Sequence, residues 1–125
     1  MIGYVTVGTN DMAKAAKFYD TLFAGIGAKR LMDMETFILW GTDMKAPGLA
    51  IIKPFDGKRA TAGNGTMVAL TVSTKKQVDA FHAKALKLGG KDEGAPGPRS
   101  PTFYAGYFRD LDGNKLNVFC ITAAS

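Results

Sequence analysis

The stretch GNGTMVALTVST, residues 63–74, decides the fold because the chain contains a second copy of it. Alternating apolar residues from Met67 onward predict a β-strand, and Ser73–Thr74 supply the side-chain oxygens that are typical of a helix N-cap. The stretch IGYVTVGTNDM, residues 2–12, repeats this order, with Tyr4 in the place of Met67 and with cap residues of its own. A strand followed directly by a capped helix is therefore predicted twice.

The two copies are offset by 63 residues, and the offset holds beyond the opening strands. Phe18 falls on Phe81, and Gly27 falls on Gly90. Because twice this offset is almost the full length of 125 residues, the sequence predicts a single domain made of two modules, residues 1–62 and 63–125.

Each module continues in the same way after its cap. Apolar residues at helical spacing are followed by glycine, which ends a helix, and then by short β-type segments. These segments are predicted at residues 29–32, 36–40 and 48–53, and then near Lys91, at 102–109 and at 115–121. The prediction is an α+β fold in which two tandem βαβββ modules form a curved sheet around a central cleft, with the helices outside.

The composition excludes several classes of protein. The chain is 46% hydrophobic, has one cysteine and has no apolar run of membrane-spanning length, so we expect a cytoplasmic protein with no membrane partner. The pI is about 9.4, but the lysines are spread over the polar faces of the predicted helices, so we expect no nucleic-acid partner. A basic pI also suits an anionic small molecule.

The chain resembles the vicinal oxygen chelate superfamily, which includes glyoxalases, bleomycin resistance proteins and extradiol dioxygenases. The likeness covers most of the chain. Its residues are YVTVGTNDMAKAAKFYDTLFAGIGAKR at 4–30, the strand–helix stretch at 53–90, EGAPGPR at 93–99 and YFRDLDGNKLNVFC at 107–120. The resemblance implies the two-module fold but leaves the activity open, because the fold hosts lyases, isomerases, oxygenases and binding proteins.

The resemblance also implies where a metal would be held. In metal-dependent members, each module supplies His or Glu from its first strand and from its last. Here the matching positions hold Tyr4, Met67 and Asn117, and residues 49–53 contain no His, Asp or Glu. Phenol, thioether and amide groups are poor ligands for Zn, Ni or Fe. We therefore expect no metal and no other cofactor, and we expect the single histidine, His82, to pack within its helix.

A ligand-binding site is still expected without a metal. Buried tyrosines need a partner for the hydroxyl group, and strand alternation predicts that Asn117 and Phe119 share a face with Lys115. Arg99 follows prolines in a predicted loop and suits a carboxylate, although a solvated arginine is the alternative. No catalytic residue is identified. The residues predicted to bind ligand are Tyr4, Trp40, Met67, Arg99, Tyr104, Tyr107 and Asn117.

Three functions follow from these predictions. The first is a bleomycin-resistance-like protein that holds a small aromatic or amphipathic molecule in the cleft. The second is a glyoxalase-like enzyme, a lyase or isomerase of the lactoylglutathione lyase type or a dioxygenase, that uses a metal or an acid–base pair such as Tyr4 and Tyr104. The third is a structural or regulatory partner protein. In each case we expect a homodimer.

Overall fold

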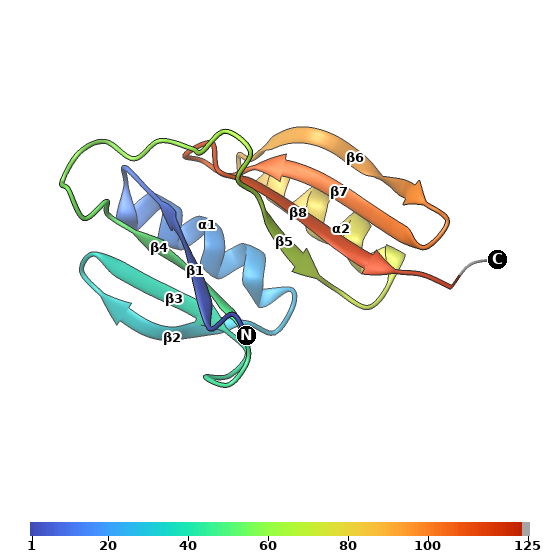
Figure 1. Ribbon diagram of the computed structural model, residues 1–125, viewed down its shortest axis with the longest axis horizontal. Helices are drawn as coiled ribbons and strands as arrows, with labels where there is room; N and C mark the ends of the chain where they lie inside the picture. Colours follow the sequence, from blue (N-terminus) through green and yellow to red (C-terminus); the bar gives the residue numbers. More distant parts are fainter. Residues whose placement is uncertain (124–125) are drawn as a thin grey trace. The chain divides into compact units, whose positions relative to one another are not determined.

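The computed structural model describes residues 1–123 and contains a repeated βαβββ order in that range (Figure 1). Its contacts divide the chain into two compact units, residues 1–62 and the part from residue 63 onward. Strand pairing runs within each unit and gives two four-stranded mixed sheets. The predicted α+β fold built from tandem βαβββ modules is confirmed.

The N-terminal module has the strand order β1-β4-β3-β2. Its first strand runs parallel to its last, because the connection crosses over through a helix, and the other neighbours are antiparallel. The helix begins after Asp11, whose carboxylate accepts a hydrogen bond from the Lys14 amide. The elements are β1 (Tyr4–Gly8), α1 (Met12–Ala24), β2 (Lys29–Met34), β3 (Phe37–Gly41) and β4 (Gly48–Ile52).

The C-terminal module repeats this topology in the order β5-β8-β7-β6, with β5 parallel to β8. Its helix begins with a capping box in which Thr74 and Gln77 exchange hydrogen bonds between side chain and backbone. The elements are β5 (Val68–Thr71), α2 (Lys75–Lys87), β6 (Lys91–Ser100), β7 (Phe103–Arg109) and β8 (Lys115–Ile121).

A hairpin turn joins the antiparallel strands β7 and β8. The buried Asp110 carboxylate accepts hydrogen bonds from the Asp112 and Asn114 amides, each at 2.9 Å. Gly113 has a φ of 88°, a backbone conformation that residues other than glycine rarely adopt. One buried carboxylate thus fixes the turn that places β8 beside β7.

The prediction for β6 was wrong. The sequence suggested only a brief strand near Lys91 followed by a proline-rich loop, but the strand continues to Ser100 with several irregularities in its register. This strand is at the edge of its sheet, where a residue without an amide hydrogen is tolerated, so Pro96 and Pro98 do not end it. Arg99 therefore lies in a strand instead of a loop.

The repeat extends to the core. Trp40 pairs with Leu49 across β3 and β4, and Phe108 pairs with Leu116 at the matching place in β7 and β8. The Trp40 ring contacts Tyr19 of α1 with ring centroids 5.6 Å apart. Each module therefore buries a large aromatic ring between its sheet and its helix.

His82 takes the place of Tyr19 in the second module. Its ring centroid lies 6.3 Å from that of Phe108, and the side chain is buried. Its Nε2 atom lies 3.1 Å from an Asp92 carboxylate oxygen and 3.0 Å from the Tyr107 carbonyl oxygen, so one ring nitrogen is satisfied by acceptors. These contacts give His82 the helix-packing role that the sequence predicted.

Neither helix within residues 1–123 has the length and hydropathy that a membrane-spanning helix requires.

Candidate functional site

The candidate site is the face of the C-terminal sheet that lies away from α2. The helix covers the other face, as Figure 1 shows, and packs against β6, β7 and β8. Successive side chains of a strand point to opposite faces, and paired residues on neighbouring strands share a face. The register pairs Tyr107 with Asn117 and Ala105 with Phe119, so these side chains form one face. The helix face instead holds Phe108, Leu116 and their neighbours.

Asn117 is the most unusual residue of this face. Its side chain is only 2% exposed, and its Oδ1 atom has no hydrogen-bond partner within residues 1–123. A buried polar atom without a partner carries a free-energy cost, so natural proteins keep few of them. The carboxamide therefore presents an acceptor that suits a donor from another molecule.

Two cations surround the ring opposite Asn117. The Arg99 guanidinium carbon lies 5.3 Å from the centroid of the Tyr107 ring, and the Lys115 ammonium nitrogen lies 5.6 Å from it. Both distances fall within the range of cation–π attraction. Gly94 allows this approach, since a Cβ atom there would stand 3.2 Å from Nη2 of Arg99 and 3.3 Å from Cδ1 of Tyr107.

The nearby carboxylate of Glu93 is bonded to a different cation. Arg109 donates a hydrogen bond from Nε to Glu93 at 2.6 Å. That bond first, and the Arg109 charge second, lower the pKa of Glu93. Within the described part of the chain, Arg99 and Lys115 form no ion pair with a carboxylate, and Arg99 donates only to the carbonyl oxygens of residues 95 and 97. Arg99 and Lys115 therefore lie outside ion-pair distance of the carboxylates in residues 1–123, and the Lys115 charge makes a smaller contribution to the lowered pKa of Glu93.

Tyr104 does not belong to this face. It lies three residues from Tyr107 on the same strand, and this odd spacing turns it toward the helix. Its hydroxyl donates to Asp79 of α2 at 2.7 Å, and this hydrogen bond, followed by burial, raises the pKa of Tyr104. The structure does not bring Tyr104 together with Asn117 as the sequence prediction required.

Trp40 does not belong to an open face either. It is 1% exposed and lies beneath α1 in the N-terminal module, and its indole nitrogen donates to Asp20 at 2.9 Å. The prediction that Trp40 lines a ligand site is corrected by this placement, because a ring buried between sheet and helix has no surface left to offer. The spacing in β3 could have indicated this placement. Phe37 and Trp40 lie three positions apart, so their side chains point to opposite faces of the sheet.

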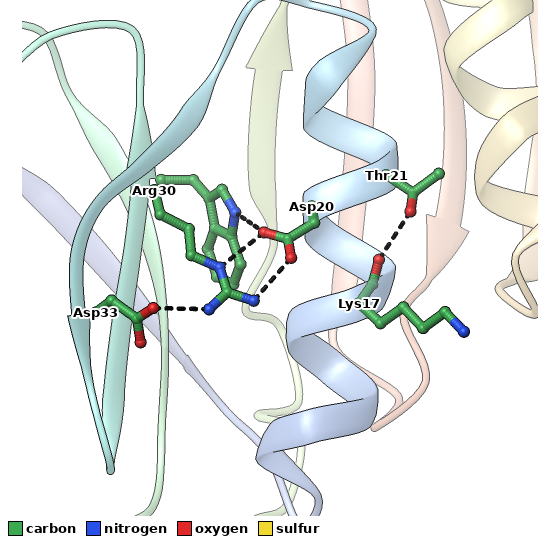
Figure 2. A network of polar contacts seen from close by, with 6 residues as sticks. Lys17, Asp20, Thr21, Arg30 and Asp33 are labelled. Carbon is green, nitrogen blue, oxygen red and sulfur yellow. Dashed lines mark hydrogen bonds and ion pairs between the residues drawn. The ribbon is translucent and has the colours of Figure 1, made fainter.

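Asp20 connects α1 to the sheet through more than this indole. Figure 2 shows the Arg30 guanidinium facing the Asp20 carboxylate, with hydrogen bonds of 2.9 Å and 2.7 Å, while its third nitrogen reaches Asp33 at 2.8 Å. The Arg30 hydrogen bond is the largest cause of a lowered pKa at Asp20, and the Trp40 bond lowers it further. The network ties the helix to β2 and β3.

Replacing Asp20 with asparagine is expected to destabilise the protein at neutral pH and to have little effect in acid. A lowered folded pKa means that the ionised carboxylate stabilises the fold above its unfolded pKa, near 3.8, and that this stabilisation is lost as the pH falls through the folded value. The pair is partly exposed, so the loss should be about 1 kcal/mol. Urea unfolding at about pH 6 and about pH 3 measures it.

Asp33→Asn is the matched control, because it removes only one hydrogen bond to Arg30 from a more exposed carboxylate. At neutral pH, Asp33→Asn should lower the free energy of unfolding by less than Asp20→Asn does. An Asp20→Asn deficit that is equally large at both pH values would contradict the assignment.

Tyr4 and Met67, the two first-strand positions, are both exposed, Tyr4 at 55% and Met67 at 40%. Tyr4 makes an edge-on contact with Phe37, with ring centroids 5.8 Å apart. Met67 lies just before β5 begins at Val68. Each is accessible, and neither makes a side-chain hydrogen bond to any of residues 1–123 that would orient it.

The donor groups present do not suit a divalent metal. The position that matches Asn117 in the first module is Ala50, since Ala50 pairs with Thr6 as Asn117 pairs with Ala69. The four positions therefore supply a phenol, a thioether, an amide and a methyl group. Within residues 1–123, no three His, Cys, Asp or Glu side chains are grouped so that they could hold an ion. Zinc, nickel and iron sites draw on imidazole, thiolate and carboxylate ligands.

Of the seven predicted site residues, the structure brings together Arg99, Tyr107 and Asn117. The sequence reasoning placed Lys115 on the face of Asn117 but did not include it among the site residues. It also did not find the pairing of Glu93 with Arg109, which leaves Lys115 without an ion-pair partner. Alternation along β7 and β8 was the available signal, because it groups residues 107, 115 and 117 once the hairpin at Asp110 is fixed.

Comparisons with known proteins agree on one family. The model of the Glyoxalase/Bleomycin resistance protein/Dioxygenase superfamily matches residues 1–118. A crystal structure of a glyoxalase/bleomycin resistance protein from Albidiferax ferrireducens T118 is 34% identical, covers 96% of this chain and 98% of its own, and superposes with a TM-score of 0.88.

Two further structures share the fold at lower identity. A glyoxalase/bleomycin resistance protein/dioxygenase family enzyme from Burkholderia phytofirmans PsJN is 19% identical, with coverage of 95% and 97% and a TM-score of 0.77. A lactoylglutathione lyase from Agrobacterium tumefaciens is also 19% identical, with coverage of 96% and 92% and a TM-score of 0.71. No curated protein sequence matches the chain. On the match over residues 1–118 and the 34% identical structure, the chain belongs to the glyoxalase/bleomycin resistance protein/dioxygenase superfamily.

Proposed function

We propose that this protein binds a small aromatic or amphipathic molecule, as a bleomycin-resistance-type member of its superfamily, and that it does so without a divalent metal. One observation carries the proposal: the buried Asn117 acceptor lies opposite a half-buried Tyr107 ring that two cations flank. The half-buried ring offers aromatic contact surface, and the amide and the cations offer polar recognition.

The donor set supports the metal-free part of the proposal. A phenol, a thioether and a neutral amide supply little negative charge to a doubly charged ion, and Ala50 supplies no donor atom at all. Asn117 also stands where the resemblance implies a His or Glu ligand on the last strand of the module. The carboxamide there is suited to hydrogen bonding with an organic ligand.

The second candidate is a glyoxalase-like lyase or isomerase, which the structural likeness to the lactoylglutathione lyase from Agrobacterium tumefaciens favours. At 19% identity this likeness concerns the fold alone. The chemistry would need a Lewis acid or an acid–base pair. Tyr104 is poorly placed for such a pair, since its hydroxyl is bonded to Asp79 on the helix side of the sheet.

Calorimetry and metal analysis together test the proposal. The protein, purified without chelator, is titrated with neutral aromatic compounds such as benzyl alcohol and indole and is assayed for Zn, Ni, Fe and Mn. We expect measurable binding of at least one aromatic compound and metal well below one ion per chain. Stoichiometric metal would favour the lyase or isomerase, and the absence of any aromatic binding would contradict the binding function.

Homodimer formation and a cytoplasmic location remain predictions. Met32 and Met34 are exposed on the edge strand β2 and provide apolar surface of the kind that interfaces use. Light scattering at micromolar concentration tests the dimer.

A further inference from the structure

We propose that the helix-free face of the C-terminal module recognises a small organic oxyanion that carries a hydroxyl or N–H group beside its charge. A hydroxycarboxylate is the simplest example. The oxyanion would lie against Arg99 and Lys115, and the donor would reach Oδ1 of Asn117. This inference rests on the proposed binding function and specifies its ligand class.

The charge of the ligand follows from the pairing on this face. Arg109 takes up the carboxylate of Glu93, with a contact of 2.6 Å. Arg99 and Lys115 are left without a carboxylate within ion-pair distance in residues 1–123, yet both stand within 6 Å of the same ring centroid. A negatively charged group beside either cation would be attracted to it, because the charges are opposite. The guanidinium fork is suited to a carboxylate or phosphate, and the ammonium group adds a point charge.

The position of Arg99 is built into the strand. Its two terminal nitrogens donate to the carbonyl oxygens of Gly97 at 2.9 Å and Ala95 at 2.7 Å, so the guanidinium is oriented by the backbone. A Cβ atom at Gly97 would lie 3.3 Å from Nη1 of Arg99, and one at Gly94 would lie 3.2 Å from Nη2. The glycines of β6 therefore leave room for the arginine beside Tyr107.

The unpaired oxygen of Asn117 indicates that the ligand carries a hydrogen-bond donor. This atom is an acceptor, so an anion alone does not satisfy it; it needs an O–H or N–H group. Asn117 lies directly opposite Tyr107 in the register, and Lys115 lies two positions before it on the same strand. The Cβ atoms of residues that are paired across strands, or that lie two positions apart on one strand, are about 5–7 Å apart. A compound with a hydroxyl next to its carboxylate can span this distance.

Four probes separate the contributions of charge and donor. Mandelate has an aromatic ring, a carboxylate and a neighbouring hydroxyl. Phenylacetate lacks the hydroxyl, mandelamide keeps the hydroxyl and replaces the carboxylate with a neutral amide, and benzyl alcohol has no acyl group. Titration calorimetry at constant ionic strength should show that mandelate binds about 10-fold more tightly than each of the other three, as expected for loss of one charge-assisted or buried hydrogen bond.

Variants assign the preference to residues. Lys115→Gln and Arg99→Gln should each reduce mandelate affinity about 10-fold and leave benzyl alcohol unchanged. Lys76→Gln, which removes the same charge from α2, is the matched control and should have no effect. Asn117→Leu should abolish the preference for mandelate over phenylacetate. It should also leave the melting temperature equal or higher, since it removes an unpaired buried oxygen.

The outcomes distinguish this inference from the proposed function. Equal binding of mandelate, mandelamide and benzyl alcohol, or equal losses in Lys115→Gln and Lys76→Gln, would overturn the oxyanion assignment and leave the aromatic-binding function standing. If benzyl alcohol binds and mandelate does not bind at millimolar concentration, the oxyanion assignment is also overturned and the aromatic-binding function stands. If no aromatic probe binds, both the inference and the proposed function fail.

Discussion

Replacing Trp40 with alanine is expected to lower the free energy of unfolding by about 3–5 kcal/mol, the range for removing a buried Trp or Phe ring. The indole is 1% exposed and lies against Tyr19 and Phe23 of α1, with ring centroids 5.6 Å and 6.2 Å away. Removing it opens a cavity between sheet and helix and leaves the Asp20 network without its indole donor. Because domains of this size are stable by only about 5–15 kcal/mol, the variant should lose a large share of its stability.

Trp40→Phe separates the two contributions. It keeps most of the ring but removes the indole N–H that donates to Asp20, so the expected loss is about 1–2 kcal/mol. The chain has a single tryptophan, so urea unfolding has to be followed by far-ultraviolet circular dichroism instead of fluorescence. Equal stability of Trp40→Ala and the unaltered protein would mean that the ring does not hold α1 to the sheet.

The repeat was the strongest signal in the sequence because the prediction for one module can be checked against the other. Each module had to supply a strand, a cap, a helix and three strands in the same order, so agreement between the two copies supported the order of elements in both. The caps at Asp11 and Thr74 and the turn at Asp110 were readable for a local reason, since their side chains bond to backbone amides a few residues away. Hydrogen bonds between residues that are close in sequence can therefore be predicted from the sequence alone.

The strand β6 could not be predicted because its stability is not local. Pro96 and Pro98 argue against a strand when only neighbours in sequence are considered. What overrides them is the position of the strand at the edge of the sheet, where one side needs no partner, and its long pairing with β7. This information exists only once the order of strands is known.

The site was predicted only in part because strand parity was applied to Asn117 and Phe119 but not to Trp40 and Tyr104. Aromatic residues were grouped by their chemistry, but Trp40 and Tyr104 face the helices, where Asp20 and Asp79 accept their polar hydrogens. Partners of this kind lie far away in sequence, and no spacing rule identifies them. Asn117, by contrast, was found through the resemblance to the superfamily, and its unpaired oxygen marks it as a residue with a role outside the core.

Replacing Phe108 with alanine is expected to cost the second module as much as Trp40→Ala costs the first, again about 3–5 kcal/mol. Phe108 is fully buried at the position that matches Trp40, and its ring centroid lies 6.1 Å from that of Phe81 and 6.3 Å from that of His82. The cavity would lie beneath α2. Its helical signal in circular dichroism should be lost at a lower urea concentration than in the unaltered protein.

Phe103→Ala is the matched control, since it removes the same atoms from the same strand but on the face away from α2. Phe103 is half-buried and stacks on Phe119 with centroids 5.0 Å apart, so its loss should cost about 1–2 kcal/mol. If Phe108→Ala does not fold, Phe108→Leu retains most of the volume and should cost less than about 1.5 kcal/mol. Equal losses for Phe103→Ala and Phe108→Ala would contradict the two-faced sheet on which the placement of the candidate site depends.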